Sequence, residues 1–482
     1  MQRIAKNSFF IFAGEIIVRI ITFFTTLVLI RYLGSGEFGK YSLVFAFLSF
    51  FEFFRGMAVD PIIIRELSKD EKRGAYLIGS AITLKFFFSL IGIVLCWIIL
   101  QLMHYPPDIK MFIYIASLTI IFSFGTLFNN IFQAKLLMKY IIAVTVFIKI
   151  LLSIFTVALV FLKAKLFYFI ALNLLLYIIQ IILVFYKSKR FLPVKVLVDL
   201  AAWKELLKNS WPISVSIIFV SIYGKIDHVM LFKMRGSYDL GFYAAAIKLT
   251  ELLVAIAAIL MTSIFPLLSE YARTSPDAFK KTYELAFKYL MLFIIPIAVM
   301  VTLYSRQIIL LCYGRNFLAS ASPLSILIWS TVFIYIGIVH SNLLVAVNLQ
   351  HLDVIFTSSF LVINVLLNLF LIPRYSFVGA AIAMAVSYAA IIVPISYALR
   401  RTRRFARAII SSMIKPSLAA FSAGYLVYFF SPLNFIFNIV LIGFIYLLLI
   451  LFIKGINLQD IRYARKIFVK SAPLSLTALN NQ

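Results

Sequence analysis

The chain has 482 residues, of which 63% are hydrophobic and only 13% are charged. A soluble domain carries about 25% charged residues, so this composition excludes a water-soluble protein. Lys and Arg number 45 against 18 Asp and Glu, an excess that in a soluble protein would indicate a nucleic-acid partner. In a membrane protein the same excess collects in cytoplasmic loops, so we expect no nucleic-acid partner.

Apolar runs long enough to cross a bilayer, about 20 residues each, follow one another along almost the whole chain. Charged residues, Pro and Gly interrupt them at intervals, as between successive membrane-spanning helices. The sequence therefore predicts an all-α polytopic membrane protein. Its helices, about fourteen in number, are expected near residues 8–30, 38–58, 75–101, 109–133, 140–162, 166–186, 209–232, 239–265, 283–304, 322–346, 353–372, 376–399, 409–430 and 434–453.

The loops between these helices predict the orientation of the chain. The first apolar run, Ser8 to Ile30, is followed by no small-residue cleavage site, so we expect it to be retained as a helix. Lys and Arg concentrate in alternate loops, which is typical of the cytoplasmic side. An even number of helices then puts both termini in the cytoplasm. The cations concerned are Arg65, Lys69, Lys72, Arg73, Lys135, Lys139, Lys187, Lys189, Arg190, Lys195, Lys204, Arg273, Lys280, Lys281 and the run Arg400, Arg401, Arg403, Arg404 and Arg407.

Two loop sequences indicate an internal repeat. Gly34 to Tyr41 reads GSGEFGKY, and Gly236 to Tyr243 reads GSYDLGFY. Each copy lies between the first two helices of its half, and an even number of helices separates the copies, so both halves enter the membrane in the same sense. This pattern predicts two six-helix lobes related by a parallel pseudo-repeat, followed by a C-terminal helix pair. Rocking of one lobe against the other is the expected motion of alternating access.

The longest polar interval predicts the boundary between the lobes. Between Lys187 and Ser210, leucines and Trp203 recur at helical spacing among charged residues, as in an amphipathic helix lying at the membrane interface. The predicted parts are therefore an N-terminal lobe at 1–190, an amphipathic interfacial linker at 191–208, a C-terminal lobe at 209–400, and helices 13 and 14 with a cytoplasmic tail at 401–482.

Charged residues inside the predicted helices are the candidate site. A charge at the bilayer centre costs at least about 2.5–3.5 kcal/mol, so each one requires a partner or water. Several are spaced three or four residues apart, which puts an acid and a base on one helical face. Those predicted to contact an anionic head group are Arg19, Arg55, Lys225 and Lys248. Those predicted to orient them, or to carry a coupling ion, are Glu15, Glu52, Asp227 and Glu251.

The position of these charges on the first two helices of each lobe predicts a shared, net cationic cavity. The alternative is that each acid and base only neutralise one another and hold helices together. The isolated Lys85, Lys149 and Lys288 are expected near an interface, where long side chains reach water. We assign those three lysines structural roles.

No catalytic or metal-binding motif is found in the sequence. The two cysteines are far apart, the four histidines do not cluster, and the Gly-rich loop used in nucleotide hydrolysis is absent. We therefore expect a transporter rather than an enzyme, with no catalytic residue, no metal and no cofactor. Transport would be driven by the membrane potential or by an H⁺ or Na⁺ gradient.

Three stretches of the sequence have a recognisable pattern: Lys6 to Tyr41, with RYLG followed by EFGKY; Asp227 to Glu251, with DHVML followed by LGFYAAAIKLTE; and Asn364 to Ala381, reading NVLLNLFLIPRYSFVGAA. They resemble bacterial lipid-linked oligosaccharide flippases of the Wzx type, which belong to the superfamily that also holds multidrug and toxic-compound extruders. The similarity extends over essentially the full chain. The glycine that usually follows the proline in this family would come after Pro373, and it is replaced here near Tyr375 and Ser376. The difference affects only the local turn.

This resemblance implies inward-facing and outward-facing states and a basic central cavity. The implied cargo is an undecaprenyl-pyrophosphate-linked repeat unit for O-antigen, capsule or exopolysaccharide, carried across a bacterial inner membrane. The implied partners are this lipid-linked oligosaccharide and the membrane lipid, with a polysaccharide polymerase and glycosyltransferases as candidate protein partners.

Three alternatives remain open from the residues. A multidrug extruder would share the fold but carry organic cations, which require acidic and aromatic cavities. A membrane polysaccharide polymerase or ligase would require a sizeable outward loop to hold an active site, and the predicted outward loops are short. A flippase for a lipid-linked peptidoglycan precursor differs only in its cargo.

Overall fold

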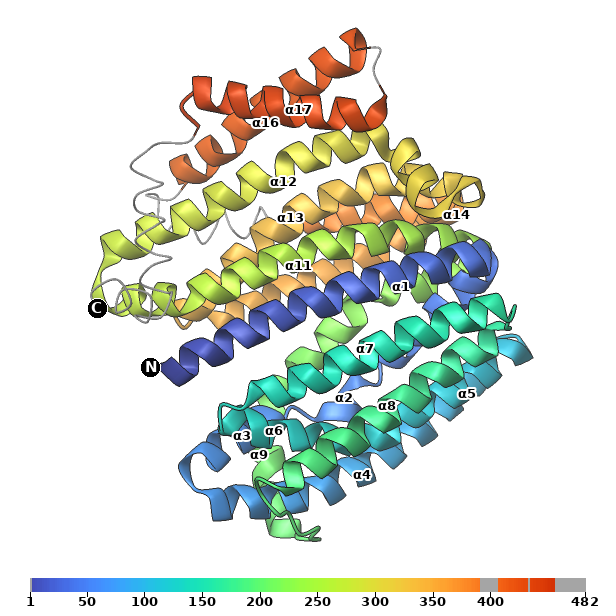
Figure 1. Ribbon diagram of the computed structural model, residues 1–482, viewed down its shortest axis with the longest axis vertical. Helices are drawn as coiled ribbons and strands as arrows, with labels where there is room; N and C mark the ends of the chain where they lie inside the picture. Colours follow the sequence, from blue (N-terminus) through green and yellow to red (C-terminus); the bar gives the residue numbers. More distant parts are fainter. Residues whose placement is uncertain (1, 391–405, 432–433, 456–482) are drawn as a thin grey trace. The chain divides into compact units, whose positions relative to one another are not determined.

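The computed structural model describes residues 2–390, 406–431 and 434–455. The arginines from Arg400 to Arg404 and the tail from residue 456 onward lie outside this range. Within it, the secondary structure is helical and no strand occurs. The chain divides into two compact units, Met1–Lys233 and Met234–Gln482 (Figure 1). The boundaries predicted from the sequence at residues 190, 208 and 400 stay predictions.

Eleven helices of the described residues are long and apolar enough to cross a membrane. Two of these spans, Ala13–Ser49 and Thr357–Ala389, each overlap two of the predicted helices. A third predicted helix, 209–232, corresponds to a pair of helices, Leu200–Tyr223 and Ile226–Arg235, outside those eleven. The prediction of an all-α polytopic membrane protein is therefore confirmed.

The first unit is built around long antiparallel helices. Helix α7 packs against α1 and α8, and α5 packs against both α4 and α8 (Figure 1). Its buried core is aliphatic and aromatic and includes Phe132 and Leu206. The helices are α1 (Gln2–Ser49), α2 (Glu52–Gly56), α3 (Asp60–Lys69), α4 (Glu71–Leu102), α5 (Pro107–Ile121), the 3₁₀ helix η1 (Phe122–Thr126), α6 (Leu127–Ala134), α7 (Met138–Phe161), α8 (Leu166–Lys189), α9 (Leu200–Tyr223) and α10 (Ile226–Arg235), which runs to the boundary between the units.

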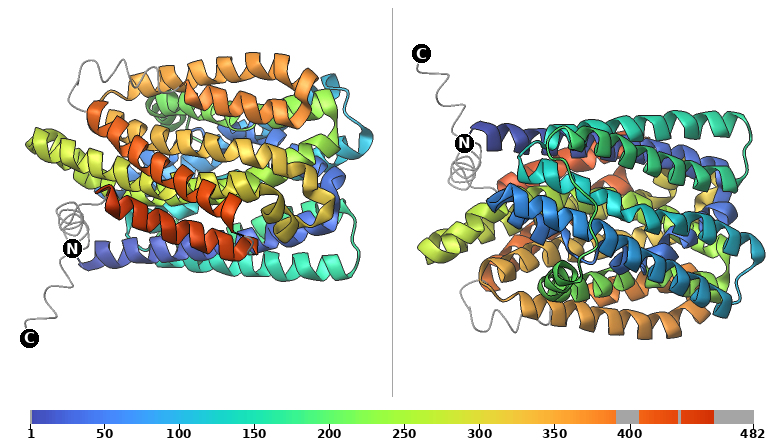
Figure 2. Two further views of the ribbon diagram at one scale, coloured as in Figure 1. Left: turned by 90° about the horizontal axis from the view of Figure 1, so that it is seen from above. Right: turned by 90° about the horizontal axis from the view of Figure 1, so that it is seen from below.

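The second unit has α13 at its centre. This helix packs against α11, α12 and α14, and the last two helices, α16 and α17, lie on α12 (Figure 2). The buried core includes Tyr283, Phe287 and Tyr335. The helices are α11 (Ser237–Thr274), α12 (Pro276–Tyr313), the 3₁₀ helix η2 (Arg315–Ser320), α13 (Ala321–Ala346), α14 (Gln350–Ala389), α16 (Ala406–Phe430) and α17 (Phe435–Phe452).

Glycines in an unusual conformation divide successive helices. Gly34, Gly236 and Gly314 have φ values of 70°, 89° and 85°, with ψ values of 175°, −173° and −174°. This region of backbone space is open essentially to glycine alone. Gly34 and Gly236 are the first residues of the two repeat copies, and their matching backbone angles support the predicted internal repeat.

A further kink has no glycine. Ser376 interrupts α14 with a φ of 50° and a ψ of −130°, in the stretch where the resemblance implies a glycine. Arg235 donates to the carbonyl of Ile372 at 3.2 Å and to that of Pro373, and Ser376 donates to Asp239. These bonds occupy carbonyls that the kink leaves without helical partners and hold the serine in a strained conformation.

The predicted second helix is interrupted, which corrects the continuous span expected at 38–58. Helix α1 ends at Ser49, α2 covers only Glu52–Gly56, and Met57 and Ala58 are left-handed with φ values of 46° and 49°. A new helix, α3, then starts at Asp60 with Pro61 in its first turn. Proline is favoured at the start of a helix because its missing N–H would be unpaired there anyway.

The predicted amphipathic linker differs from its expected form. Residues 191–199 form no helix, and α9 begins at Leu200 and continues without a break to Tyr223. The Asp199 side chain caps this helix by accepting from the N–H groups of Ala201 and Ala202. Trp203 donates to the carbonyl of Ser80 at 3.0 Å, so the start of α9 is fastened to α4.

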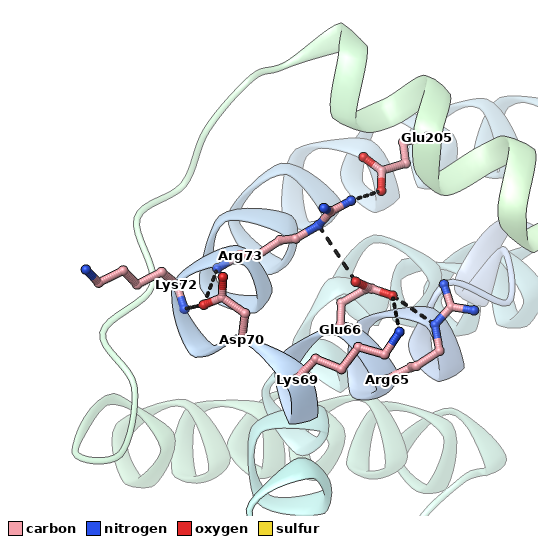
Figure 3. Close-up of polar contacts among 7 residues, drawn as sticks. All are labelled: Arg65, Glu66, Lys69, Asp70, Lys72, Arg73 and Glu205. Carbon is pink, nitrogen blue, oxygen red and sulfur yellow. Dashed lines mark hydrogen bonds and ion pairs between the residues drawn. The ribbon is translucent and has the colours of Figure 1, made fainter.

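A cluster of charges also fastens α9 to α3 and α4 (Figure 3). Arg73 donates to Glu205 of α9 at 2.6 Å and lies 3.7 Å from Glu66 of α3. Arg65 and Lys69 also pair with Glu66, at 2.9 Å and 3.8 Å. The hydrogen bond from Arg65 lowers the pKa of Glu66 below its usual value. The cations of this cluster are therefore neutralised by acids beside them.

Replacing the turn glycines should destabilise the protein through backbone strain alone. Gly34→Ala and Gly236→Ala meet no atom within 4 Å of the new Cβ, so each should cost about 1–3 kcal/mol from the positive φ. The measurement is the unfolding temperature of the purified protein in detergent. Gly56→Ala is the control, because it also meets open space but has no positive φ. Equal unfolding temperatures for all three variants would contradict this account.

The link between Asp199 and Tyr76 should make stability depend on pH. The hydrogen bond from the Tyr76 hydroxyl lowers the pKa of Asp199 in the folded protein, so the unfolded state binds this proton more tightly. The stabilisation is then complete above the unfolded pKa of about 3.9 and is lost as the pH falls through the lower folded pKa.

We therefore expect Tyr76→Phe to lower the unfolding temperature at pH 7 and to approach the wild type below about pH 4. Tyr168→Phe, which removes another exposed hydroxyl, is the control and should change neither value. A deficit of Tyr76→Phe that is the same at both pH values would show that the hydroxyl acts only through packing.

Candidate functional site

Three of the predicted acid–base pairs exist as ion pairs on single helices. They are Glu15 with Arg19 at 4.0 Å, Glu52 with Arg55 at 2.8 Å, and Glu251 with Lys248 at 2.6 Å. All six side chains are between 29% and 52% exposed. Ion pairs this open contribute only about 0–1 kcal/mol, so a charged ligand can displace either partner at little cost.

The fourth predicted group has a different geometry. Lys225 lies in the turn between α9 and α10, so the helix expected around it is interrupted there. Asp227 is buried in the first turn of α10, with its Oδ1 3.5 Å from Nδ1 of His228. Both Asp227 and His228 are less than 5% exposed. The carboxylate is therefore withdrawn from any large ligand.

These charges are divided between the two units. Arg19, Arg55 and Lys225 belong to the first unit and Lys248 to the second, and their meeting along one path stays a prediction. The expectation of a shared, net cationic cavity therefore stays a prediction.

The Glu52–Arg55 pair lies where the second predicted helix is broken. Both residues belong to the five-residue helix α2, bounded by a turn on one side and two left-handed residues on the other. The Arg55 guanidinium also lies over the ring of Tyr177 on α8, 5.7 Å from its centroid. Interrupted membrane helices present backbone and side-chain groups that a continuous helix would use internally. This break is the strongest candidate for a ligand contact in the first unit.

A buried ion pair directly follows the break. Lys85, on α4, is completely buried, and its Nζ donates to Asp60 Oδ2 and to Thr126 Oγ1, each at 3.0 Å. Asn130 donates to the other oxygen of Asp60 at 2.8 Å. The expectation that Lys85 reaches an interface is therefore wrong, because Asp60 of α3 and Thr126 of η1 satisfy its ammonium inside the unit.

The two pairs are close in the chain. Glu52 and Arg55 belong to α2 and Asp60 starts α3, and both helices pack against α4. Sequence reasoning missed Asp60, Asn130 and Tyr177 as parts of this group. The available signal was the dipeptide Asp60-Pro61 inside an apolar run, which favours the start of a new turn or helix and therefore a break in the span.

No group of three or more His, Cys, Asp or Glu side chains in the described residues is arranged to hold a metal ion. The polar groups around the break are carboxylates, cations, hydroxyls and amides. This donor set suits the binding of charged head groups and the exchange of ion-pair partners.

Two family models match the sequence. The family described as polysaccharide biosynthesis protein matches residues 4–272, which is more than half of the chain. The family described as MatE matches residues 212–370. No curated protein was found to match the sequence.

Several solved structures have the same fold. A lipid II flippase MurJ in an inward closed conformation is 17% identical, with a TM-score of 0.78 over 92% of this chain and 99% of that chain. An inward-facing multidrug resistance MATE family transporter is 15% identical, with a TM-score of 0.64 over 81% and 95% of the two chains. A MOP superfamily transporter from Pyrococcus furiosus is 14% identical, with a TM-score of 0.53 over 84% and 95%. At these identities the likeness concerns the fold.

Breaking the buried pair from one side should be strongly destabilising. Asp60→Asn leaves the Lys85 ammonium buried without a carboxylate, which should cost about 3–5 kcal/mol. The double variant Asp60→Asn/Lys85→Met removes both charges and should recover part of that loss. The measurement is a double-mutant cycle on unfolding temperature and on membrane abundance. Additive losses from the two single variants would contradict a direct interaction.

Proposed function

We propose that this chain, which belongs to the polysaccharide biosynthesis protein family, is a flippase for a lipid-linked oligosaccharide. Its cargo would be an undecaprenyl-pyrophosphate-linked repeat unit, moved from the cytoplasmic to the outer leaflet of a bacterial inner membrane. The chain is a multi-pass membrane protein with the fold of flippases and multidrug transporters. Alternating access between its two halves would carry the head group across.

The observation that carries this proposal is the open Glu52–Arg55 pair in the broken second helix. Arg55 is held by one carboxylate and one aromatic ring, and its side chain is 29% exposed. A guanidinium forms short, frequently bidentate hydrogen bonds with phosphate oxygens. A pyrophosphate can therefore replace Glu52 as the partner of Arg55, at the cost of an ion pair that contributes little by itself.

The energetics of the cargo support a transporter that shelters the polar head group and leaves the polyprenyl tail in lipid. Polar groups and charges of the head cannot enter hydrocarbon without a large desolvation cost. The polyprenyl tail gains about 0.8 kcal/mol for each buried CH₂ group and stays in lipid. The protein then has to shelter only the pyrophosphate and sugars, while the tail follows outside.

The remaining predicted residues complete the mechanism. Arg19, Lys225 and Lys248 would contact the head group at other stages of transport, and Glu15, Glu52, Asp227 and Glu251 would orient the bases or carry a coupling ion. The membrane potential or an H⁺ or Na⁺ gradient would drive the cycle, with no resident cofactor. Glycosyltransferases that build the cargo and a polymerase that uses it would act before and after transport, and both termini would be cytoplasmic.

Extrusion of organic cations is the second candidate, because the acids of the open pairs are as accessible as the bases. Glu15 is 52% exposed and Arg19 is 44% exposed. A cationic drug could therefore take the place of the arginine in the same pair. The MatE match over residues 212–370 supports this candidate. The same replacement would hold for the Glu52–Arg55 pair. The two functions therefore predict opposite roles for Arg55, which contacts the cargo in the flippase and is displaced by the drug in the extruder.

One experiment separates these functions. In a strain lacking the gene, we expect a surface glycan to disappear and its lipid-linked precursor to accumulate on the cytoplasmic leaflet. The wild-type gene should restore export, whereas Arg55→Ala should reduce it by about 10–100-fold through loss of a charge-assisted hydrogen bond. Arg19→Ala should act in the same direction. Export is measured by labelling the outer-leaflet lipid-linked sugar.

Arg65→Ala is the matched control, because it removes an arginine that pairs with its neighbour Glu66 outside the predicted path. All variants must be compared at equal membrane abundance. Drug sensitivity without precursor accumulation in the deletion strain would favour the extruder. Full export by Arg55→Ala would remove this residue from the site.

A further inference from the structure

Two lysines from different helices converge on one aromatic ring at the end of the α7–α8 pair. The Nζ of Lys139 lies 5.0 Å from the centroid of the Tyr140 ring, and the Nζ of Lys187 lies 6.0 Å from the same centroid. Each contact is a cation–π interaction. Two like charges therefore lie near the same ring, and an anion that contacts both would reduce their mutual repulsion.

The ring is held firmly in place. Tyr140 packs against Phe132 and Phe191, with centroid distances of 5.8 Å and 5.3 Å, and those two rings also contact each other at 5.6 Å. Lys135 ties this cluster to its surroundings by donating to the carbonyl of Phe191 at 3.1 Å and pairing with Glu71 at 2.8 Å. The lysines thus flank a fixed aromatic platform joining the ends of α6, α7 and α8.

Lys139 and Lys187 differ from the cations in Figure 3 in their ion pairing. Arg65, Lys69 and Arg73 share the carboxylate of Glu66, and Arg73 also holds Glu205. In the part of the chain that the structure describes, neither Lys139 nor Lys187 forms an ion pair with a carboxylate, and both are exposed. Lys189 and Arg190 add two further exposed cations at the end of α8. Positive charge therefore accumulates here without internal compensation.

The position along the helices indicates which anion fits. Lys139 is near the start of the span Met138–Phe161, and Lys187 is near the end of the span Leu166–Lys189. Because residues 162–165 alone connect these antiparallel helices, both lysines lie at the same end of the spans, where lipid head groups are found.

Apolar side chains continue from this end into the spans. On α8, Tyr186 is 66% exposed and Ile182 is 45% exposed, while on α7, Phe147 is 49% exposed. A tyrosine next to the cations and aliphatic or aromatic groups farther along are the pattern of a surface that meets a head group and then acyl chains. A molecule with a phosphate at one end and hydrocarbon at the other matches both parts.

We propose that Lys139, Tyr140 and Lys187 form a binding site for the phosphate of an anionic phospholipid such as phosphatidylglycerol. The two ammonium groups bind the phosphate by charge-assisted hydrogen bonds, and the ring of Tyr140 fixes the separation of the helix ends that carry them. This site lies at the rim of the first unit and does not depend on the identity of the transported cargo.

The test measures lipid retention by the purified full-length protein. Native mass spectrometry counts bound phosphatidylglycerol and phosphatidylcholine after equal exposure to both lipids in detergent. Wild-type protein should retain phosphatidylglycerol preferentially, and Lys139→Gln/Lys187→Gln should weaken this retention about 30-fold, since a juxtamembrane cation contributes about 1 kcal/mol each. Arg65→Gln/Lys69→Gln also removes two cations, but ones already paired with Glu66, and should retain the lipid normally.

Three results would overturn the proposal. Equal retention of the two lipids by the wild type would exclude selection of an anionic head group. Unchanged retention by Lys139→Gln/Lys187→Gln would exclude this site, provided that its unfolding temperature matches the wild type. Selective retention of undecaprenyl pyrophosphate with no preference for phosphatidylglycerol would identify the surface as a contact for a polyprenyl lipid. Failure of the export assay with Arg55→Ala would leave all of these outcomes unaffected.

Discussion

The cost of placing charge in hydrocarbon governs the structure of this protein. A charged side chain away from water requires a partner, and the partner's accessibility decides what the pair can do. Lys85 is completely buried and is satisfied by Asp60 and Thr126, so its charge is committed to holding α3, α4 and η1 together. Arg55 is paired with Glu52, whose side chain is 44% exposed, so in the proposed mechanism a ligand replaces that carboxylate. The acids of these two ion pairs, Glu52 and Asp60, are close in the chain, but one pair is open and the other has a fully buried base.

Interruption of helices is the second constraint, and it follows from the first. A continuous helix satisfies its own backbone and leaves only side chains to bind a ligand. The break from Phe50 to Val59 allows α2 and α3 to point their charged residues toward α4 and α8, which no straight helix could do. The glycine turns at Gly34, Gly236 and Gly314 have the complementary role, since they reverse or kink the chain without any side chain in the way. At Ser376 a different positive-φ kink is accompanied by a hydrogen bond to Asp239, outside the turn.

The distribution of unpaired cations follows the same logic at the ends of the helices. Around Glu66 the protein neutralises its own arginines and lysines, which fastens α9 to α3 and α4. Around Tyr140 the described residues supply no carboxylate partner for Lys139 or Lys187, so these charges remain open to lipid. A membrane with anionic lipids supplies the missing partner at that position. The basic excess of the sequence therefore divides into charge used internally and charge directed to lipid.

The sequence by itself determined the membrane class, the helical segments, the paired spacing of Glu52 with Arg55 and of Lys248 with Glu251, and the repeat glycines. These are local properties, because hydrophobic run length, helical periodicity and glycine's conformational freedom act within a few residues of each other. Only the tertiary structure decided that Asp60 meets Lys85 and Asn130, that Arg55 lies over Tyr177, and that Lys139 and Lys187 share a ring. Each of these contacts joins different helices, and helix packing depends on the shapes of many side chains at once, which no local spacing encodes.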